Sequence, residues 1–306
     1  MHQAEIERLV GGPPRLSLDV IVNHPRMVPA RKAYIDRFLE VYSGDPFLVR
    51  LLIESGRFIV YHSAVVLEAA QDPARRDTWL TVGRLKQAIQ LYGLASDRQI
   101  DHLIRRLCSV GFLALKPAPA DKRVRIVSPT EAMKAHDRKW LAAHFAPLEI
   151  LYPEHDYSPV LRRDPQFQIL FRRQAVAFLS LGAELMQFSP DMMLFLSRAA
   201  GFPVIAALLQ AAMARPDGLH AAIPYEDAGE RFGVSRTHVR QLLVAAEEAG
   251  LVKLHARGGH RVEILPRLWV SHDRGMSAGM HGHDLVYMAT QRALACQASQ
   301  AVKAVG

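Results

Sequence analysis

The residues best suited to chemistry in this chain are basic and polar side chains near the start of a candidate helix. In residues 232–254, FGVSRTHVRQLLVAAEEAGLVKL, apolar side chains recur at i, i+3, i+4 and i+7 from Val239 to Ala246, as on the buried face of a helix. Arg236 and Arg240 lie mostly off that apolar stripe. Guanidinium groups in this position are suited to phosphates and base edges, so the pattern indicates recognition of a nucleic acid.

A second segment repeats this pattern. Residues 96–115, SDRQIDHLIRRLCSVGFLAL, align with residues 235–254 at a constant offset of 139 (235 − 96). An earlier block, residues 38–52, aligns with residues 195–209 at an offset of 157 (195 − 38), with Gly and Pro at matching positions. Two collinear blocks predict an internal duplication, in which the first copy has a longer stretch between its leading helix and the repeated segment.

Each aligned segment, taken with the residues on either side of it, predicts a helix-turn-helix followed by a β-hairpin. Gly93 and Gly233 end the first helix of each pair, because glycine tolerates the left-handed conformation that reverses the chain. Ser96 and Ser235 are good N-caps for the second helix. The hairpin strands are expected at 112–116 and 123–127, and at 251–255 and 261–265.

Positive charge is concentrated in these two segments, which belong to what we call the first head (residues 80–128) and the second head (residues 217–268). Residues 96–127 hold seven Lys/Arg and three Asp (7 − 3 = +4), and residues 235–265 hold five Lys/Arg and three Glu (5 − 3 = +2). Six of the net +8 charges therefore lie in two short stretches, which favours a polyanionic partner.

The predicted contacts to double-stranded DNA come from the second helix and the hairpin of each head. They are Ser96, Arg98, Gln99, His102, Arg105, Arg106, Lys122, Arg123 and Arg125 in the first head, and Ser235, Arg236, Thr237, His238, Arg240, Gln241, Arg257, His260 and Arg261 in the second head.

Residues 80–150 resemble a winged-helix regulator of the MarR family. The resemblance rests on DKRVRIVSPTEAMKAHDRKWL (121–141), which is similar to that family's D-x-R wing followed by Thr and a long helix. It implies that Arg123 enters the minor groove and that Asp121 orients it. The family's Leu-Thr after the second strand is replaced here by Ser128-Pro129-Thr130.

The second head resembles a winged helix-turn-helix nearer to the GntR type. It lacks the D-x-R wing, so Arg257 or Arg261 would have to substitute. MarR-like proteins are ordinarily homodimers, and half of this chain has the size of one such subunit. The resemblance therefore implies a monomeric pseudo-dimer whose heads meet successive major grooves about 34 Å apart. Because the heads differ in sequence, we expect an asymmetric binding site.

The predicted fold is mainly α, with small β-hairpin wings and two winged helix-turn-helix domains joined by a helical layer like that of a dimer. The expected divisions are an N-terminal extension (1–28), a first repeat (29–155) and a second repeat (160–306). Helices are expected near 29–42, 46–70, 82–92, 97–110, 130–146, 164–187, 190–213, 224–232, 236–249 and 285–303.

Composition predicts a soluble, cytoplasmic protein. Half of the 306 residues are apolar, which is enough for packed cores. The two cysteines, Cys108 and Cys296, make no disulfide framework and no CxxC pair. The N-terminus has no apolar signal region, and the most apolar stretch, residues 199–214, is too short to span a bilayer.

Three further segments are open to more than one interpretation. Residues 271–284 contain His272, Asp273, His281, His283 and Asp284, which would suit a metal in an extended segment, but the glycine content favours a flexible connector and no metal. Residues 162–173 are expected to form a solvated amphipathic helix. A group of apolar residues could line an effector pocket or simply belong to the core. They are Met186, Phe188, Met192, Met193 and Phe195.

Taken together, these features predict a sequence-specific DNA-binding transcriptional regulator that needs no cofactor. No nucleotide loop, HExxH or GxSxG occurs in the sequence, so no enzyme is predicted. The alternatives are a plasmid-type replication initiator, a structural protein that uses winged helices for docking, and a DNA-repair enzyme.

Overall fold

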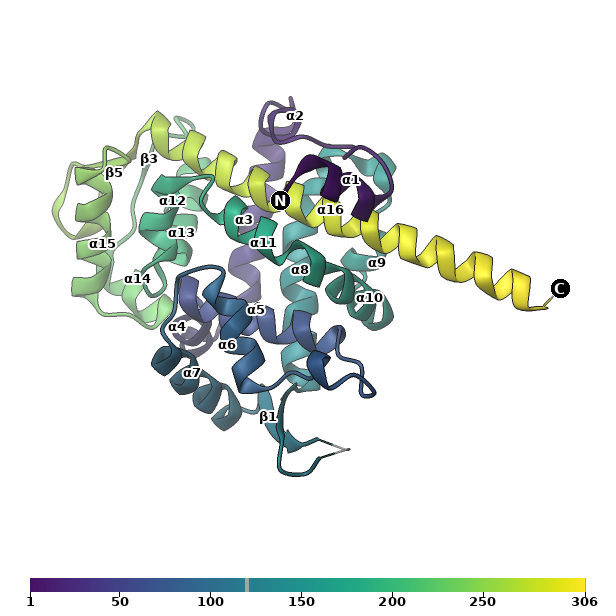
Figure 1. Ribbon diagram of the computed structural model, residues 1–306. Coiled ribbons are helices and arrows are strands. Elements are labelled where there is room, and N and C mark those ends of the chain that lie inside the picture. The colour runs from purple at the N-terminus through teal and green to yellow at the C-terminus, as the bar shows by residue number, and fades with distance from the viewer. Residues whose placement is uncertain (119–120, 306) are drawn as a thin grey trace.

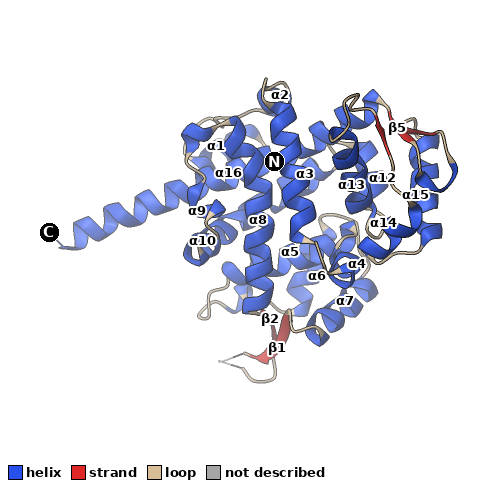
Figure 2. Cartoon of the chain, turned by 180° about the vertical axis from the view of Figure 1, so that it is seen from behind, coloured by secondary structure: helices blue, strands red, loops and turns tan. Residues whose placement is uncertain are grey.

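The computed structural model describes residues 1–118 and 121–305. The chain is mainly helical, as the sequence predicts, and carries two small antiparallel sheets (Figures 1 and 2). In the first half, the elements in chain order are α1 (Gln3–Val10), α2 (Leu18–Val22), α3 (Met27–Val41), α4 (Pro46–Leu52), α5 (Ser55–Ala69), η1 (Arg76–Thr78), α6 (Val82–Gln90), α7 (Asp97–Ser109), β1 (Leu113–Pro117), β2 (Arg125–Pro129) and α8 (Glu131–Leu151).

The second half has more short helices. Its elements are η2 (Pro153–His155), α9 (Ser158–Leu161), α10 (Pro165–Ala175), η3 (Val176–Phe178), α11 (Leu179–Met186), α12 (Pro190–Leu196), α13 (Gly201–Met213), β3 (His220–Ala221), α14 (Tyr225–Phe232), α15 (Arg236–Glu248), β4 (Val252–Leu254), η4 (Arg257–Gly259), β5 (Val262–Ile264) and α16 (Pro266–Val305).

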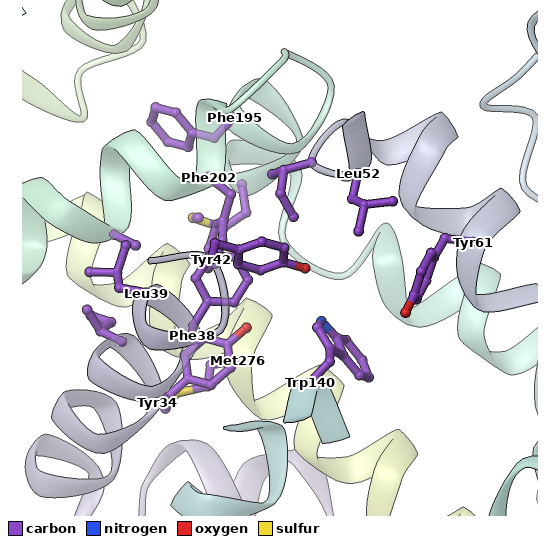
Figure 3. Packing of buried hydrophobic residues seen from close by; sticks show 14 of the residues in the cluster. Tyr34, Phe38, Leu39, Tyr42, Leu52, Tyr61, Trp140, Phe195, Phe202 and Met276 are labelled. Atoms are coloured by element: carbon purple, nitrogen blue, oxygen red, sulfur yellow. The ribbon is translucent and has the colours of Figure 1, made fainter. Parts of the chain in front are cut away.

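Helix α16 crosses the whole helical body, and its C-terminal end projects beyond it (Figure 1). Helices α1 and α2 pack against α16, so the segment expected to be an N-terminal extension is part of the body. Helix α3 packs along α8 in the first half and also contacts α13 of the second half. Buried apolar side chains from both halves form one continuous core (Figure 3).

Several expected helices are divided or extended. The stretch 46–70 is interrupted at Ile53 and Glu54, and the stretch 190–213 is interrupted between α12 and α13. The helix expected at 130–146 continues through Pro147 to Leu151. In the described part of the chain no single helix is long and apolar enough to cross a membrane. Helices α12 and α13 together have that length and composition, but the chain bends by 112° between them.

The prediction for residues 271–284 is wrong, because they form the interior of α16 rather than an extended connector. Packing outweighs the low helix propensity of the glycines. A Cβ on Gly282 would lie 2.9 Å from Leu185 Cδ1, so the missing side chain lets α11 approach α16 closely. Successive helical residues point in different directions, so His281 and His283 do not face one side as they would in a strand.

The strands lie close to their expected positions. Strands β1 and β2 pair from Leu113↔Pro129 to Pro117↔Arg125, one to two residues later than predicted. The second sheet has the order β3-β5-β4 and includes His220–Ala221, a strand that the sequence did not predict because two residues show no periodicity.

Candidate nucleic-acid interface and interior cavity

The first head places its predicted recognition residues on the exposed side of α7. Ser96 caps this helix: its Oγ accepts from the Gln99 backbone N–H, and the Gln99 side chain accepts in return from the Ser96 backbone N–H at 2.8 Å. Arg98, His102 and Arg105 are exposed, while Ile100, Leu103, Ile104 and Leu107 face the core. The α7 surface is therefore built from arginine and histidine side chains on a buried apolar base.

Acidic groups on α7 are paired within the first head. Lys86 of α6 lies 2.8 Å from the Asp101 carboxylate and 3.6 Å from that of Asp97. These pairs join α6 to α7 and partly neutralise the two carboxylates, so the exposed arginines dominate the charge of this surface.

The first hairpin carries Lys122, Arg123 and Arg125, all exposed. Asp121 Oδ1 accepts from the Arg123 backbone N–H at 3.1 Å and from its Nε at 3.3 Å, the contact that the family resemblance implies. The Arg123 side chain is 92% exposed, so its guanidinium group extends into solvent while Asp121 holds its base.

The second head has the same order of helices. Gly233 ends α14 in the left-handed conformation (φ 69°), and Ser235 caps α15 by accepting from the His238 backbone N–H at 3.1 Å. Arg236, Thr237, Arg240 and Gln241 are exposed, as predicted. Val239, Leu242, Leu243 and Ala246 are buried, which confirms the apolar stripe.

The predicted DNA contact His238 differs from its neighbours. Its imidazole is half-buried, and Nε2 lies 2.8 Å from the Ala199 carbonyl oxygen. This side chain therefore joins α15 to the turn before α13. The structure gives it a packing contact, and we leave it out of the proposed DNA interface.

The second hairpin is short, and its tip folds back. Gly259 is buried, its carbonyl accepts from the Ile223 N–H at 2.8 Å, and a Cβ there would lie 2.1 Å from the Ile223 oxygen. Arg257, His260 and Arg261 remain exposed around this tip. The turn is therefore held against the segment before α14, whereas the first hairpin projects from the body (Figure 1).

Helix α4 lies between the two heads (Figures 1 and 2). It packs against α14 of the second head, and its Phe47 ring lies near Arg106 of the first head. The Pro46 carbonyl at its start fits beneath the Gly233 turn, where a Cβ would lie only 2.5 Å away. Arg106 of α7 is half-buried, and its guanidinium group lies 5.7 Å from the centre of the Phe47 ring. The second head lies at the end of the body opposite the C-terminal end of α16, and the first head lies along the lower edge in Figure 1.

A cavity of about 320 Å³ lies in the core between the two halves. Its lining is mostly apolar and aromatic and includes Tyr34 and Phe38 of α3, Trp140 of α8, Phe202 of α13 and Met276 of α16, which converge from different helices in Figure 3. Of the apolar residues that the sequence singled out, Met186 and Met192 line the cavity. Phe195 is fully buried in the surrounding core.

Four histidines, His62, His144, His272 and His283, also line the cavity. Burial lowers the pKa of His62 to about 4 and that of His283 to about 3, and burial likewise holds the pKa of His144 well below its usual range. His62, His144 and His283 are therefore neutral near pH 7. Trp140 Nε1 and His272 Nε2 are buried without a hydrogen-bond partner in the described part of the chain.

One wall of the cavity contains a buried ion pair that the sequence did not predict. Arg172 of α10 donates from Nε to Asp137 Oδ2 of α8 at 3.0 Å, and His62 Nδ1 lies 3.3 Å from Asp137 Oδ1. Burial opposes the charge of Asp137, but Arg172 and the hydrogen bonds from His62 and Arg172 hold the pKa of this carboxyl well below its usual range. The amphipathic helix expected at 162–173 forms as α10, but Arg172 at its basic C-terminal end is buried rather than solvated.

Comparison of the chain with protein-family models, with curated proteins and with solved structures finds no match.

Proposed function

We propose that the chain is a sequence-specific, double-stranded-DNA-binding transcriptional regulator, a monomeric pseudo-dimer with two unequal winged helix-turn-helix heads. The observation that carries this proposal is that a backbone hydrogen bond joins the second hairpin strand to the segment before the first helix in both heads. The Val127 N–H donates to the Leu80 carbonyl at 2.7 Å, and the Ile264 N–H donates to the Leu219 carbonyl at 2.8 Å. The two acceptors are 139 residues apart (219 − 80), the offset of the two sequences, and the two donors are 137 residues apart (264 − 127).

This bond connects the second hairpin strand to the segment that precedes the first helix of each head, two residues before α6 and six residues before α14. Both heads also share one order of elements: a helix, a turn, a serine-capped helix and a hairpin. The short β3 strand adds the third strand beside the second hairpin. The matching order and the matching bond favour a common winged-helix design in the two heads.

Charge supports DNA as the partner of these surfaces. Arg98 and Arg105 on α7, and Arg236 and Arg240 on α15, are exposed along helices whose opposite faces are buried. Exposed arginines along one helix face can contact both phosphates and base edges. Each hairpin then adds exposed basic residues for the sugar-phosphate backbone.

The contacts of α4 support the pseudo-dimer. A regulator that meets two successive grooves must hold its heads at a fixed spacing. In this chain α4 lies against the turn of the second head and against Arg106 of the first head. We infer that α4 is the spacer between the two DNA-binding surfaces.

Genome-wide crosslinking tests this function. We expect the bound sites to lie in promoters and to share a sequence motif. Binding confined to iterated sites near an origin would instead favour a replication initiator. Binding without a motif, together with weak salt dependence, would favour a docking role and contradict regulation through sequence recognition.

The interior cavity supports control by a small-molecule effector. Its volume is at the lower end of the range for ligand sites, and its lining is apolar with a few polar groups. Because Arg172 is already neutralised by Asp137, and His62, His144 and His283 are neutral, we propose an uncharged aromatic ligand. A ligand hydroxyl would give a partner to a polar group such as His272 Nε2.

Phenol and toluene are suitable probes for this cavity. We expect phenol to raise the melting temperature more than toluene, because only phenol has a hydroxyl group. In Gly279→Leu the effect of both should disappear, since Gly279 lines the cavity and no atom lies within 4 Å of the position that a Cβ would take there. Equal shifts in the parent protein and in Gly279→Leu would contradict this site.

A further inference from the structure

Two imidazoles and one carboxylate converge on one face of the second sheet. His220 lies on β3, His255 follows β4 directly, and Glu263 lies on β5. One potential ligand atom from each residue lies within 4.8 Å of the other two. None of these three residues belongs to the surface proposed for base recognition on α15.

The strand register explains why the three side chains meet. The order β3-β5-β4 places Glu263 on the central strand, directly opposite His220. The His255 N–H donates to the Arg261 carbonyl at 3.0 Å, so His255 lies opposite Arg261, two residues before Glu263. Residues directly opposite and residues two apart on a strand share one face of a sheet, so all three side chains point the same way.

The hydrogen bonds around these side chains suit a metal ion. Asp217 Oδ2 lies 3.0 Å from His220 Nδ1 and orients this imidazole, leaving Nε2 available. A carboxylate bonded to the second ring nitrogen is the usual support of a metal-binding histidine. Asp217 is itself fixed, because its Oδ1 accepts from the Leu219 N–H at 3.1 Å and from the His220 N–H at 3.3 Å.

The same geometry selects the kind of metal. Two imidazoles and one carboxylate suit zinc and similar divalent transition metals better than calcium or magnesium, which prefer oxygen ligands. Tetrahedral zinc with such ligands separates the ligand atoms by about 3.3 Å. His255 Nε2 and Glu263 Oε2 are 2.6 Å apart, so small side-chain rotations would open the set around an ion.

We propose that His220, His255 and Glu263 bind a zinc ion, that Asp217 positions His220, and that the ion joins the three strands at the base of the second hairpin. The strands have only two or three residues each, so one ion adds a strong connection to a short hydrogen-bond ladder. Arg257 and Arg261 lie on the tip above this base, and the ion would fix the position of both.

This site is confined to the second head. The positions that correspond to His220 and His255 at the offset of 139 are Thr81 and Lys116. Ser128, which pairs with Ala114 as Glu263 pairs with Lys253, lies where the first hairpin would need the carboxylate. Zinc would therefore act on one of the two heads. The inference does not depend on the proposed regulatory function, because the metal can be measured without DNA.

Zinc titration of the chelator-treated full chain against a chromophoric competitor tests the proposal. We expect one tight equivalent in the parent protein. We expect His220→Ala, His255→Ala and Glu263→Gln each to abolish it, and Asp217→Asn to weaken it by about 10–100-fold. His260→Ala is the matched control, because His260 is an exposed histidine on the same hairpin outside the cluster, and it should bind normally.

Cobalt(II) gives a second readout that does not depend on affinity alone. The parent protein and His260→Ala should show the visible absorption of four-coordinate cobalt, and the three ligand variants should lose it. Circular dichroism of the metal-free variants should match that of the parent, since the three side chains are partly exposed. Unchanged zinc affinity and an unchanged cobalt spectrum in the triple variant would overturn the proposal.

Discussion

At the residue scale, the arginines of the two heads differ in the element that carries them and in the contacts that position them. Arg236 and Arg240 extend from a rigid, serine-capped helix, whereas Arg123 extends from a hairpin and is positioned by Asp121. We expect Arg236→Ala and Arg240→Ala to cost about 1–3 kcal/mol for each lost base contact and to relax sequence preference. Arg123→Ala should weaken binding to all duplexes more evenly.

Fluorescence anisotropy with a selected site and a scrambled duplex measures both effects. Arg162→Ala is the control, because this exposed arginine lies on the helical body outside both heads. If the three head variants bind both duplexes like the parent protein, the two-headed model is wrong.

Buried histidines predict how stability depends on pH. Burial lowers the pKa of His62 and His136 to about 4 and that of His283 to about 3, below the ordinary value of 6.5. The unfolded chain therefore binds these protons at a pH where the folded chain does not. Stability is fully retained above about pH 6.5 and falls on acidification towards pH 4, by up to about 1.4 kcal/mol per pH unit for each histidine.

Urea denaturation at pH 7, 6 and 5 measures this slope. His283→Gln should reduce the pH dependence of the free energy of unfolding by the contribution of one buried histidine. His102→Gln should leave this dependence unchanged, because His102 is exposed. A free energy of unfolding that stays constant between pH 7 and 5 would contradict the burial of neutral imidazoles.

At the element scale, the Asp137–Arg172 pair joins α8 to α10 beside the cavity. Asp137→Asn would leave the buried guanidinium without a counter-charge, so we expect a loss of about 3–5 kcal/mol in the free energy of unfolding. The double variant Asp137→Asn/Arg172→Met should recover much of this loss. A cost below about 1 kcal/mol for Asp137→Asn, measured by urea denaturation, would show that the pair is not desolvated.

The sequence predicts helices well where a regular spacing of apolar residues marks the buried face. The stripe from Val239 to Ala246 and the two capping serines locate α7 and α15 to within about two residues. Residues 271–284 could not be placed in this way, because the glycines that lower helix propensity are the ones that allow α11 to approach α16. The Arg172–Asp137 pair could not be predicted either, since its residues are 35 positions apart.

At the scale of the whole molecule, one continuous core joins the two halves, and α4 contacts both heads. This arrangement fixes the heads relative to each other without a second chain. The heads themselves are unequal, because α7 carries Arg98 and Arg105 where α15 carries Thr237 and Val244 at the same offset. A fixed pair of unequal surfaces should recognise two different half-sites in one orientation.

Selection of duplexes from a random library by the full-length protein tests this central claim most directly. We predict an asymmetric motif of two unlike half-sites centred about 10 base pairs apart. Arg98→Ala should relax one half-site, and Arg236→Ala should relax the other. A selected motif with perfect dyad symmetry, or the absence of any enriched motif, would contradict the account.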